Sequence, residues 1–191
     1  YRRQSIPPPQ ARLPSVPMRI LVIGAGGVGS AFATIAASRP VFTDIVLADI
    51  DGVRAGVAAA QAGSDRVRGT RLDASNRSEI VQLAQSMRAD IIVNACDPRM
   101  NPPIFDAAFE ASCHYLDMAM HMSMPHPSRP FDECGVKLGD AQFAVSNDWA
   151  ERGQLALVGM GVEPGLSDVF ARFAADHLFE RIIDVGVRDG S

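Results

Sequence analysis

Glycine residues gather at one point of the chain, where Gly24-Ala25-Gly26-Gly27-Val28-Gly29 fits the pattern G-x-G-x-x-G. The missing side chains suit the binding of a dinucleotide: Gly24 permits a tight turn, Gly26 lets the backbone approach a pyrophosphate, and Gly29 lets a helix lie close to a sheet. The start of that helix would present free N–H groups and a positive dipole end to the phosphates. The pattern gains weight from its context, because it directly follows an apolar strand and opens a helix.

A carboxylate, Asp49, stands 20 positions after Gly29, at the end of the apolar segment 45–49. In a dinucleotide-binding fold this is the place of the acid that accepts hydrogen bonds from the ribose hydroxyls. A carboxylate there repels the 2′-phosphate of NADP, so the sequence favours NAD over NADP. Arg54, the first arginine downstream, can still fold over the same site. The alternative interpretation is a packing turn with an acid at this spacing by coincidence.

Further cofactor contacts are expected after the third and fourth predicted strands. Asp73 ends the third strand and Ala74 follows it, at a place where a side chain or the backbone can meet the adenine edge. Asp73 alternatively caps the next helix, a role for which Ser75 and Asn76 compete.

The loop Asn94-Ala95-Cys96-Asp97 is expected beside the nicotinamide. Asn94 either contacts the cofactor or only pins the loop by side-chain hydrogen bonds. Cys96 is interpreted mainly as a small buried hydrophobic residue that can touch the nicotinamide, since a thiol nucleophile would need a neighbouring base.

Candidates for acid–base chemistry are few, and the catalytic group is not identified by the sequence. Asp117 ends a predicted strand and either faces the crevice or fixes the loop that follows, while His121 follows the same strand and is a candidate for substrate contact. Lys137 is the only lysine of the chain and is interpreted as solvated. The Met- and His-rich run 118–126 offers soft ligands for copper, but it has no regular ligand spacing, and we predict no metal site.

The segment 161–168, Gly-Val-Glu-Pro-Gly-Leu-Ser-Asp, joins the sixth predicted strand to a helix at the same edge. Glu163, Gly165 and Asp168 are therefore candidates for the substrate side of the crevice. Backbone N–H groups near Ser167 or Asp168 either bind a substrate carboxylate or belong to a capping turn alone.

These residues need a scaffold, and the hydrophobic pattern supplies one. Unbroken apolar runs of strand length alternate with helical segments of about three turns, which is typical of a parallel sheet covered on both faces. The expected strands are 18–23, 45–49, 67–73, 90–95, 114–119 and 155–160, with a last strand-like run at 181–190. The expected helices are 28–39, 52–63, 78–88, 103–113, 140–151 and 166–179, and segment 120–138 is expected to be irregular.

Composition limits the class of protein. The chain has 191 residues and a net charge of −4, and Arg2, Arg3 and Arg12 lie in the first 17 residues, so the remainder is more acidic still. An acidic body argues against a nucleic-acid binder. No apolar run approaches the roughly 20 residues that span a bilayer. Three scattered cysteines indicate a reducing compartment, and hence the cytoplasm. The Pro-rich residues 1–17 are expected to be a disordered tail.

Four motifs in order, GAGGVG, IIVNACDP, HYLDMA and GVEPGLSD, resemble the saccharopine dehydrogenase family over about residues 18–190. The resemblance implies an NAD(P)-dependent enzyme that makes or breaks a secondary amine of an amino acid. It also implies that Gly27 and Val28 join the other glycines at the pyrophosphate, that 94–97 lies by the nicotinamide and that 163–168 borders the substrate. The chain departs from the family pattern at Cys96 and Asp97, where small or apolar residues and proline are common.

We therefore expect an α/β protein with a doubly wound parallel Rossmann sheet in 18–160 and the beginning of a second α+β domain in 161–191. The expected function is hydride transfer at a C–N bond of an amino-acid-derived secondary amine, with this chain inactive by itself. The alternatives are an enzyme like carboxynorspermidine or lysine dehydrogenase, or a sensor module that binds the dinucleotide without turnover. The expected partners are a small amino-acid substrate and a second copy in a homodimer, with neither nucleic acid nor membrane.

Overall fold

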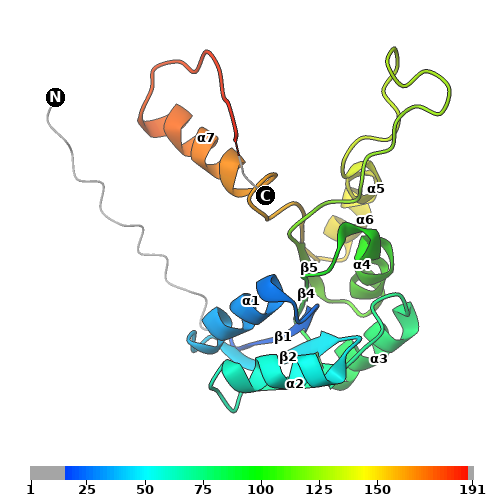
Figure 1. The fold of residues 1–191 in the computed structure, drawn as a ribbon, viewed down its shortest axis with the longest axis vertical. Coiled ribbons are helices and arrows are strands. Elements are labelled where there is room, and N and C mark those ends of the chain that lie inside the picture. The colour runs from blue at the N-terminus through cyan, green and yellow to red at the C-terminus, as the bar shows by residue number, and fades with distance from the viewer. Residues whose placement is uncertain (1–15, 189–191) are drawn as a thin grey trace, which may run out of the picture.

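A computed structural model describes residues 16–188, which form a six-stranded sheet with helices on both faces (Figure 1). The strand order is β3-β2-β1-β4-β5-β6, and all five strand pairs are parallel. The order reverses between β1 and β4, which is the switch point of a doubly wound sheet. The predicted Rossmann architecture is confirmed.

The elements alternate along the chain as the apolar runs predict. The strands are β1 (Met18–Ile23), β2 (Phe42–Asp49), β3 (Val67–Arg71), β4 (Ile91–Asn94), β5 (His114–Asp117) and β6 (Ala156–Leu157). The helices are α1 (Gly27–Ala37), α2 (Gly52–Gln61), α3 (Arg77–Ser86), the 3-10 turn η1 (Pro98–Met100), α4 (Asn101–Glu110), α5 (Asp140–Ala144), α6 (Ser146–Glu151) and α7 (Leu166–His177).

The core has two layers, one on each face of the sheet, because successive strand residues point to opposite faces. In β1, Ile20 and Val22 pack with the small residues of α1 and α2, whereas Leu21 and Ile23 pack toward α3 and α4. Both sets are almost fully buried, which explains why the strand is apolar without alternation.

The register brings polar residues to one edge of the sheet. Ile23 pairs with Asn94, and Asn94 pairs with Asp117, so the carboxyl ends of β1, β4 and β5 are level. Asp49 ends β2 at the same edge, one position beyond the residue that pairs with Ile23. Residues far apart in the sequence therefore meet along one crevice.

Three expectations about elements differ from the structure. The helix expected at 140–151 is divided at Val145, whose φ of −104° and ψ of 16° lie outside the helical range; the division lets Trp149 of α6 reach the core beside Phe105. The sixth strand is only 156–157, because it pairs with β5 at the edge of the sheet for two residues. The described part of the run expected as a last strand, 181–188, is not a strand, and no neighbouring strand pairs with it.

Other segments lie outside the sheet. The irregular segment 120–138 is confirmed; it projects from the body in Figure 1 and is closed by an antiparallel bridge between Met124 and Val136. Figure 1 also shows α7 standing apart from the sheet. Residues 1–15 of the expected tail lie outside the described residues, and the division of the chain at 160/161 stays a prediction. Within residues 16–188, no helix combines the length and the apolar composition needed to cross a membrane.

Candidate dinucleotide-binding site

The glycine loop joins β1 to α1, and two of its glycines are required by the protein itself. Gly24 has a φ of +104°, and a Cβ there would lie 2.7 Å from the carbonyl oxygen of Ala95. A Cβ on Gly29 would lie 1.8 Å from the carbonyl oxygen of Gly24. These two positions hold the loop tightly between β1, α1 and the loop after β4.

Gly26 and Gly27 have no such explanation inside the chain. A Cβ on either residue would meet nothing within 4 Å, and Gly26 has an ordinary extended φ of −74°. Gly26 is also the N-cap of α1, and no side chain caps this helix. The loop therefore presents bare backbone and an uncapped helix N-terminus to open space, which fits the pyrophosphate of a dinucleotide.

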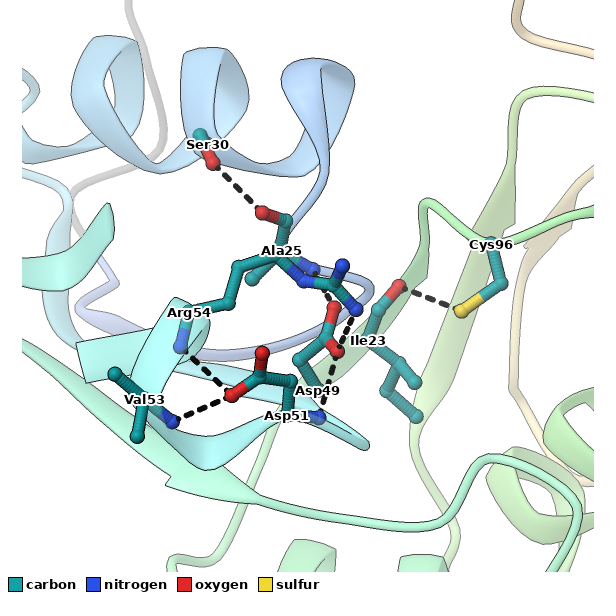
Figure 2. A network of polar contacts seen from close by, with 8 residues as sticks. All are labelled: Ile23, Ala25, Ser30, Asp49, Asp51, Val53, Arg54 and Cys96. Carbon is teal, nitrogen blue, oxygen red and sulfur yellow. Dashed lines mark hydrogen bonds and ion pairs between the residues drawn. The ribbon is translucent and has the colours of Figure 1, made fainter. Parts of the chain in front are cut away.

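Asp49 lies at the centre of the polar contacts drawn in Figure 2. One carboxylate oxygen, Oδ2, accepts a hydrogen bond of 2.7 Å from the backbone N–H of Ala25, which ties the end of β2 to the glycine loop. The other, Oδ1, accepts from the backbone N–H of Asp51 at 2.9 Å and from the Arg54 guanidinium at 2.5 Å. Burial opposes ionisation of Asp49, but hydrogen bonds from Arg54, Asp51 and Ala25 outweigh it, so its pKa lies below the ordinary 3.8.

Arg54 comes from the first turn of α2 and reaches over the end of β2 to form an ion pair with Asp49 (Figure 2). Asp51 caps the same helix, since its side chain accepts from the N–H groups of Val53 and Arg54. The sequence points to Arg54 as a residue able to fold over Asp49, and the structure places it there. The capping role of Asp51 was not foreseen, although an Asp just before a helix is a strong N-cap signal.

Asp73 makes a local turn. Its carboxylate accepts from the backbone N–H and the hydroxyl of Ser75, at 2.9 and 2.7 Å. Asn76, and not Asp73, caps α3 by accepting from the backbone N–H of Glu79. Of the competing residues, Asn76 therefore has the capping role. Adenine contact by Asp73 and Ala74 stays a prediction.

Asn94 pins the loop that follows β4. Its Oδ1 accepts from the backbone N–H of Cys96 at 3.0 Å, and its Nδ2 donates to Asn101 Oδ1 at 2.6 Å. Cys96 lies against the glycine loop, and its thiol donates to the carbonyl of Ile23 at 3.3 Å (Figure 2). Burial, helped by the nearby charges of Asp49 and Asp97, raises the pKa of the Cys96 thiol to about 11, so this thiol is a poor nucleophile.

Asp117 is 1% exposed and fixes the loop after β6. Its Oδ1 accepts from the backbone N–H of Gly159 and its Oδ2 from Gln142 Nε2, both at 2.6 Å. Burial raises the pKa of Asp117, although these two hydrogen bonds oppose the shift. Of the two roles weighed for Asp117, the structure therefore supports the loop-fixing one.

His121 lies next to this network. Its ring packs edge-on against Phe105 with 5.8 Å between the centroids, and its backbone N–H donates to Gln142 Oε1 at 2.9 Å. Burial lowers the pKa of His121, although the charge of Asp117 acts against the shift. A half-buried, neutral imidazole can accept a proton, so His121 remains the better candidate for acid–base chemistry.

The loop before α7 is a compact turn. A Cβ on Gly165, whose φ is +131°, would lie 2.4 Å from the carbonyl oxygen of Gly161. Asp168 accepts from the backbone N–H of Gly165 at 2.9 Å, so this acid occupies the start of α7. The capping role weighed for Asp168 is thus observed, while Glu163 is exposed. Asp97, on the loop after β4, pairs with Arg99 through a hydrogen bond of 2.8 Å.

Three buried residues that form hydrogen bonds with Asn94 or Asp117 were missed by sequence reasoning. They are Asn101, Tyr115 and Gln142. Asn101 and Gln142 carry polar amides yet are 1% and 4% exposed. Their partners lie on other elements, so no spacing in the sequence indicates them. Among residues 16–188, no group of three or more His, Cys, Asp or Glu side chains is placed to hold a metal ion.

The fold and the glycine loop define a Rossmann domain for a nicotinamide dinucleotide. The family model described as saccharopine dehydrogenase NADP binding domain matches residues 20–157, and the chain belongs to this family. Among solved structures, the saccharopine dehydrogenase (L-Glu forming) of Saccharomyces cerevisiae superposes with a TM-score of 0.64 at 16% identity, over 84% of this chain and 31% of that one. Quinate dehydrogenase of Corynebacterium glutamicum in complex with NAD gives a TM-score of 0.50 at 24% identity, over 85% and 52% of the two chains. At these identities the likeness concerns the fold alone.

Two curated relatives are more similar in sequence. Carboxyaminopropylagmatine dehydrogenase of Synechocystis is 34% identical over 86% of this chain, and carboxynorspermidine synthase of Vibrio cholerae is 30% identical over 90% of it. The aligned regions are 39% and 43% of those proteins. The chain thus spans about two fifths of the length of these relatives.

Proposed function

We propose that this chain is the cofactor-binding part of an NAD(P)-dependent oxidoreductase that transfers a hydride at the C–N bond of an amine-derived substrate. The support comes from the family match over residues 20–157 and from relatives that are named dehydrogenase and synthase. The names of the two curated relatives denote amines that carry a carboxyl group. They favour a carboxylated polyamine over saccharopine as the substrate.

One observation carries the proposal, namely the bare backbone at Gly26 and Gly27. The fold gives no reason for glycine at these two positions, whereas close approach of a pyrophosphate does. When bound, the nicotinamide supplies hydride acceptance or donation. The chain's own residues supply N–H groups at the start of α1 and a carboxylate, Asp49, at the end of β2.

The test is a titration of the chain with NADH and with NADPH, in which binding is measured by nicotinamide fluorescence or by calorimetry. Gly26→Ala should leave the thermal midpoint unchanged, because its methyl group has free space, yet should weaken binding at least about tenfold by blocking the pyrophosphate. Gly56→Ala is the matched control, since a Cβ at Gly56 also meets nothing within 4 Å and this residue lies in α2. Failure of the unmodified chain to bind either nucleotide would refute the proposal.

For the cofactor, we propose that NAD is favoured over NADP. The reason is that Asp49, buried and ionised, repels a 2′-phosphate and can accept a ribose hydroxyl. Arg54 lies on Asp49 and reduces that repulsion, so the expected preference is moderate.

On the substrate side, the candidates are His121 together with the loops that contain Asp97 and 163–168. His121 would hold or accept the proton that leaves the amine as the C–H bond gives up its hydride. Substrate turnover is best sought with the full-length protein and a carboxylated polyamine, with saccharopine and lysine as comparisons. A sensor module would bind the dinucleotide with no turnover of any of them.

Two further parts of the proposal concern the setting of the protein. We propose a homodimer and a cytoplasmic location. Analytical ultracentrifugation tests the first, and fractionation of cells that express the tagged protein tests the second.

A further inference from the structure

Buried hydrogen bonds at the carboxyl ends of β5 and β6 lead to one carboxylate, Asp117. Within residues 16–188, no Lys or Arg side chain forms an ion pair with it. An ionised carboxylate only accepts hydrogen bonds, so every partner must present an N–H or O–H group to it. Asp117 therefore sets the direction of each hydrogen bond that leads from it.

The first branch runs through Gln142 to the loop after β5. Because Gln142 Nε2 donates to Asp117, its amide oxygen faces the other way and accepts from the backbone N–H of His121 at 2.9 Å. The reverse orientation of the amide would set donor against donor at His121. The carboxylate thus decides which way Gln142 points.

The second branch is direct. Gly159 donates its backbone N–H to Asp117 Oδ1 at 2.6 Å, and Met160 donates its backbone N–H to the main-chain oxygen of the same residue at 2.9 Å. These two contacts hold the start of the loop that connects β6 to α7.

The loop after β4 is held by a separate set of hydrogen bonds. Asn94 Nδ2 donates to Asn101 Oδ1 at 2.6 Å and to the Tyr115 hydroxyl at 3.2 Å. Asn94 Oδ1 therefore faces the backbone N–H of Cys96 and accepts from it at 3.0 Å.

We propose that Asp117 is a positioning residue that, through these directed hydrogen bonds, fixes one backbone N–H in each of the two loops that follow β5 and β6, on the nicotinamide side of the crevice. The inference rests on the proposed function, which supplies the cofactor that these loops would face. The adenosine side has a separate network around Asp49, on the other side of β1. A substitution at Asp117 should therefore weaken the binding of the nicotinamide half of the cofactor and leave the binding of the adenosine half unchanged.

Exchanging the carboxylate of Asp117 and the amide of Gln142 tests the direction of the hydrogen bond between them. In Asp117→Asn, a new N–H group must face a donor, so one loop loses its partner. In Gln142→Glu, two carboxylates face each other without a proton between them. In the double variant Asp117→Asn/Gln142→Glu, the new Asn donates to the new Glu, and each still has an oxygen for the N–H of Gly159 or of His121.

The readout compares NADH with ADP-ribose, which lacks only the nicotinamide ring, by calorimetry on the chain at neutral pH. Each single variant should lower the affinity for NADH about tenfold and the affinity for ADP-ribose less than about twofold. The double variant should recover most of the affinity for NADH. Tyr115→Phe keeps the ring and leaves both branches from Asp117 intact, because its hydroxyl accepts from Asn94, so it should leave the ratio of the two affinities unchanged. Asp106→Asn, at an exposed position, should change neither affinity.

Three results would overturn the inference. The first is equal weakening of both ligands, which indicates general destabilisation. The second is an unchanged ratio of the two affinities in both single variants, Asp117→Asn and Gln142→Glu. The third is a double variant that is weaker than either single one. If the unmodified chain binds neither ADP-ribose nor NADH, the proposed function itself fails, and the inference fails with it.

Discussion

Asp49 already accepts three hydrogen bonds from the protein, and this sets how a ribose can reach it. Ala25 holds one carboxylate oxygen, while Asp51 and Arg54 share the other. The two backbone donors belong to the fold, but the Arg54 side chain is half exposed and can leave. The ribose binding proposed for Asp49 would therefore require little more than the displacement of one guanidinium, which would then be available for other anions.

This arrangement predicts a selective effect of Arg54→Ala on cofactor binding. Affinity for NADPH should fall about tenfold, because the guanidinium that can pair with a 2′-phosphate is lost, whereas affinity for NADH should stay within about twofold. Titration with both nucleotides measures the ratio. Arg68→Ala is the control, since Arg68 forms an ion pair with Asp44 on β2, at the opposite end of that strand from Asp49. An equal loss for the two nucleotides would contradict the prediction.

The lowered pKa of Asp49 predicts a dependence of stability on pH. Since the pKa is lower in the folded state than the ordinary 3.8, the carboxylate stabilises the fold fully above that value and loses this effect as the pH falls through the folded pKa. Asp49→Asn should be less stable than the unmodified chain at pH 6. The difference in the free energy of unfolding between the two proteins should become smaller below about pH 3.8. Urea unfolding of both proteins across this pH range measures the difference. A difference in stability that does not change with pH would contradict the prediction.

At the residue scale, the sequence predicts the two features that depend on fixed spacing, the glycine loop and Asp49. It also places Asn94 and Asp117 correctly at strand ends, but it leaves their roles open. The partners that decide those roles, such as Gln142 on α5, come from elsewhere in the chain and obey no period. Side-chain hydrogen bonds between distant elements exist only once the chain has folded.

At the element scale, apolar runs determine most of the sheet, and errors occur where local pattern and tertiary packing disagree. The run 140–151 has helical composition throughout, yet it divides at Val145 because Trp149 packs onto Phe105 and Phe109. The run at 181–188 has strand composition, but no neighbouring strand pairs with it. A strand depends on its partner, which the local sequence does not contain.

The packing of α2 on β3 gives a prediction at this scale. A Cβ on Gly69 would lie 2.4 Å from the backbone carbonyl of Ala55, which cannot move without shifting the helix. Gly69→Ala should therefore lower the free energy of unfolding by about 1–3 kcal/mol. Gly186→Ala, which meets nothing within 4 Å, is the control. Chemical denaturation measures both, and equal stability of the two variants would show that α2 adjusts freely.

For the whole molecule, the sheet and its switch point could be predicted from the sequence, and the arrangement around α7 could not. None of the residues of α7 is buried, and its apolar side chains line a groove of about 640 Å³ with residues 179–188. The sequence predicts a helix at 166–179, but it does not say which surface this helix packs against. Asp49 and Asp117 are two buried carboxylates on opposite sides of β1, and each has its own set of hydrogen bonds.

The contacts that lead from Asp117 end on the main-chain N–H groups of His121 and Gly159, and those of Asn94 end on that of Cys96. Every amino acid except proline has this group, so the loops can exchange their side chains without losing their anchorage. In such an arrangement the backbone of a loop determines its position, and the side chains of the loop determine its chemistry. Mutations that change the lining of the crevice would then be tolerated by the fold, and a scaffold of this kind can diversify its substrates while its cofactor geometry stays constant.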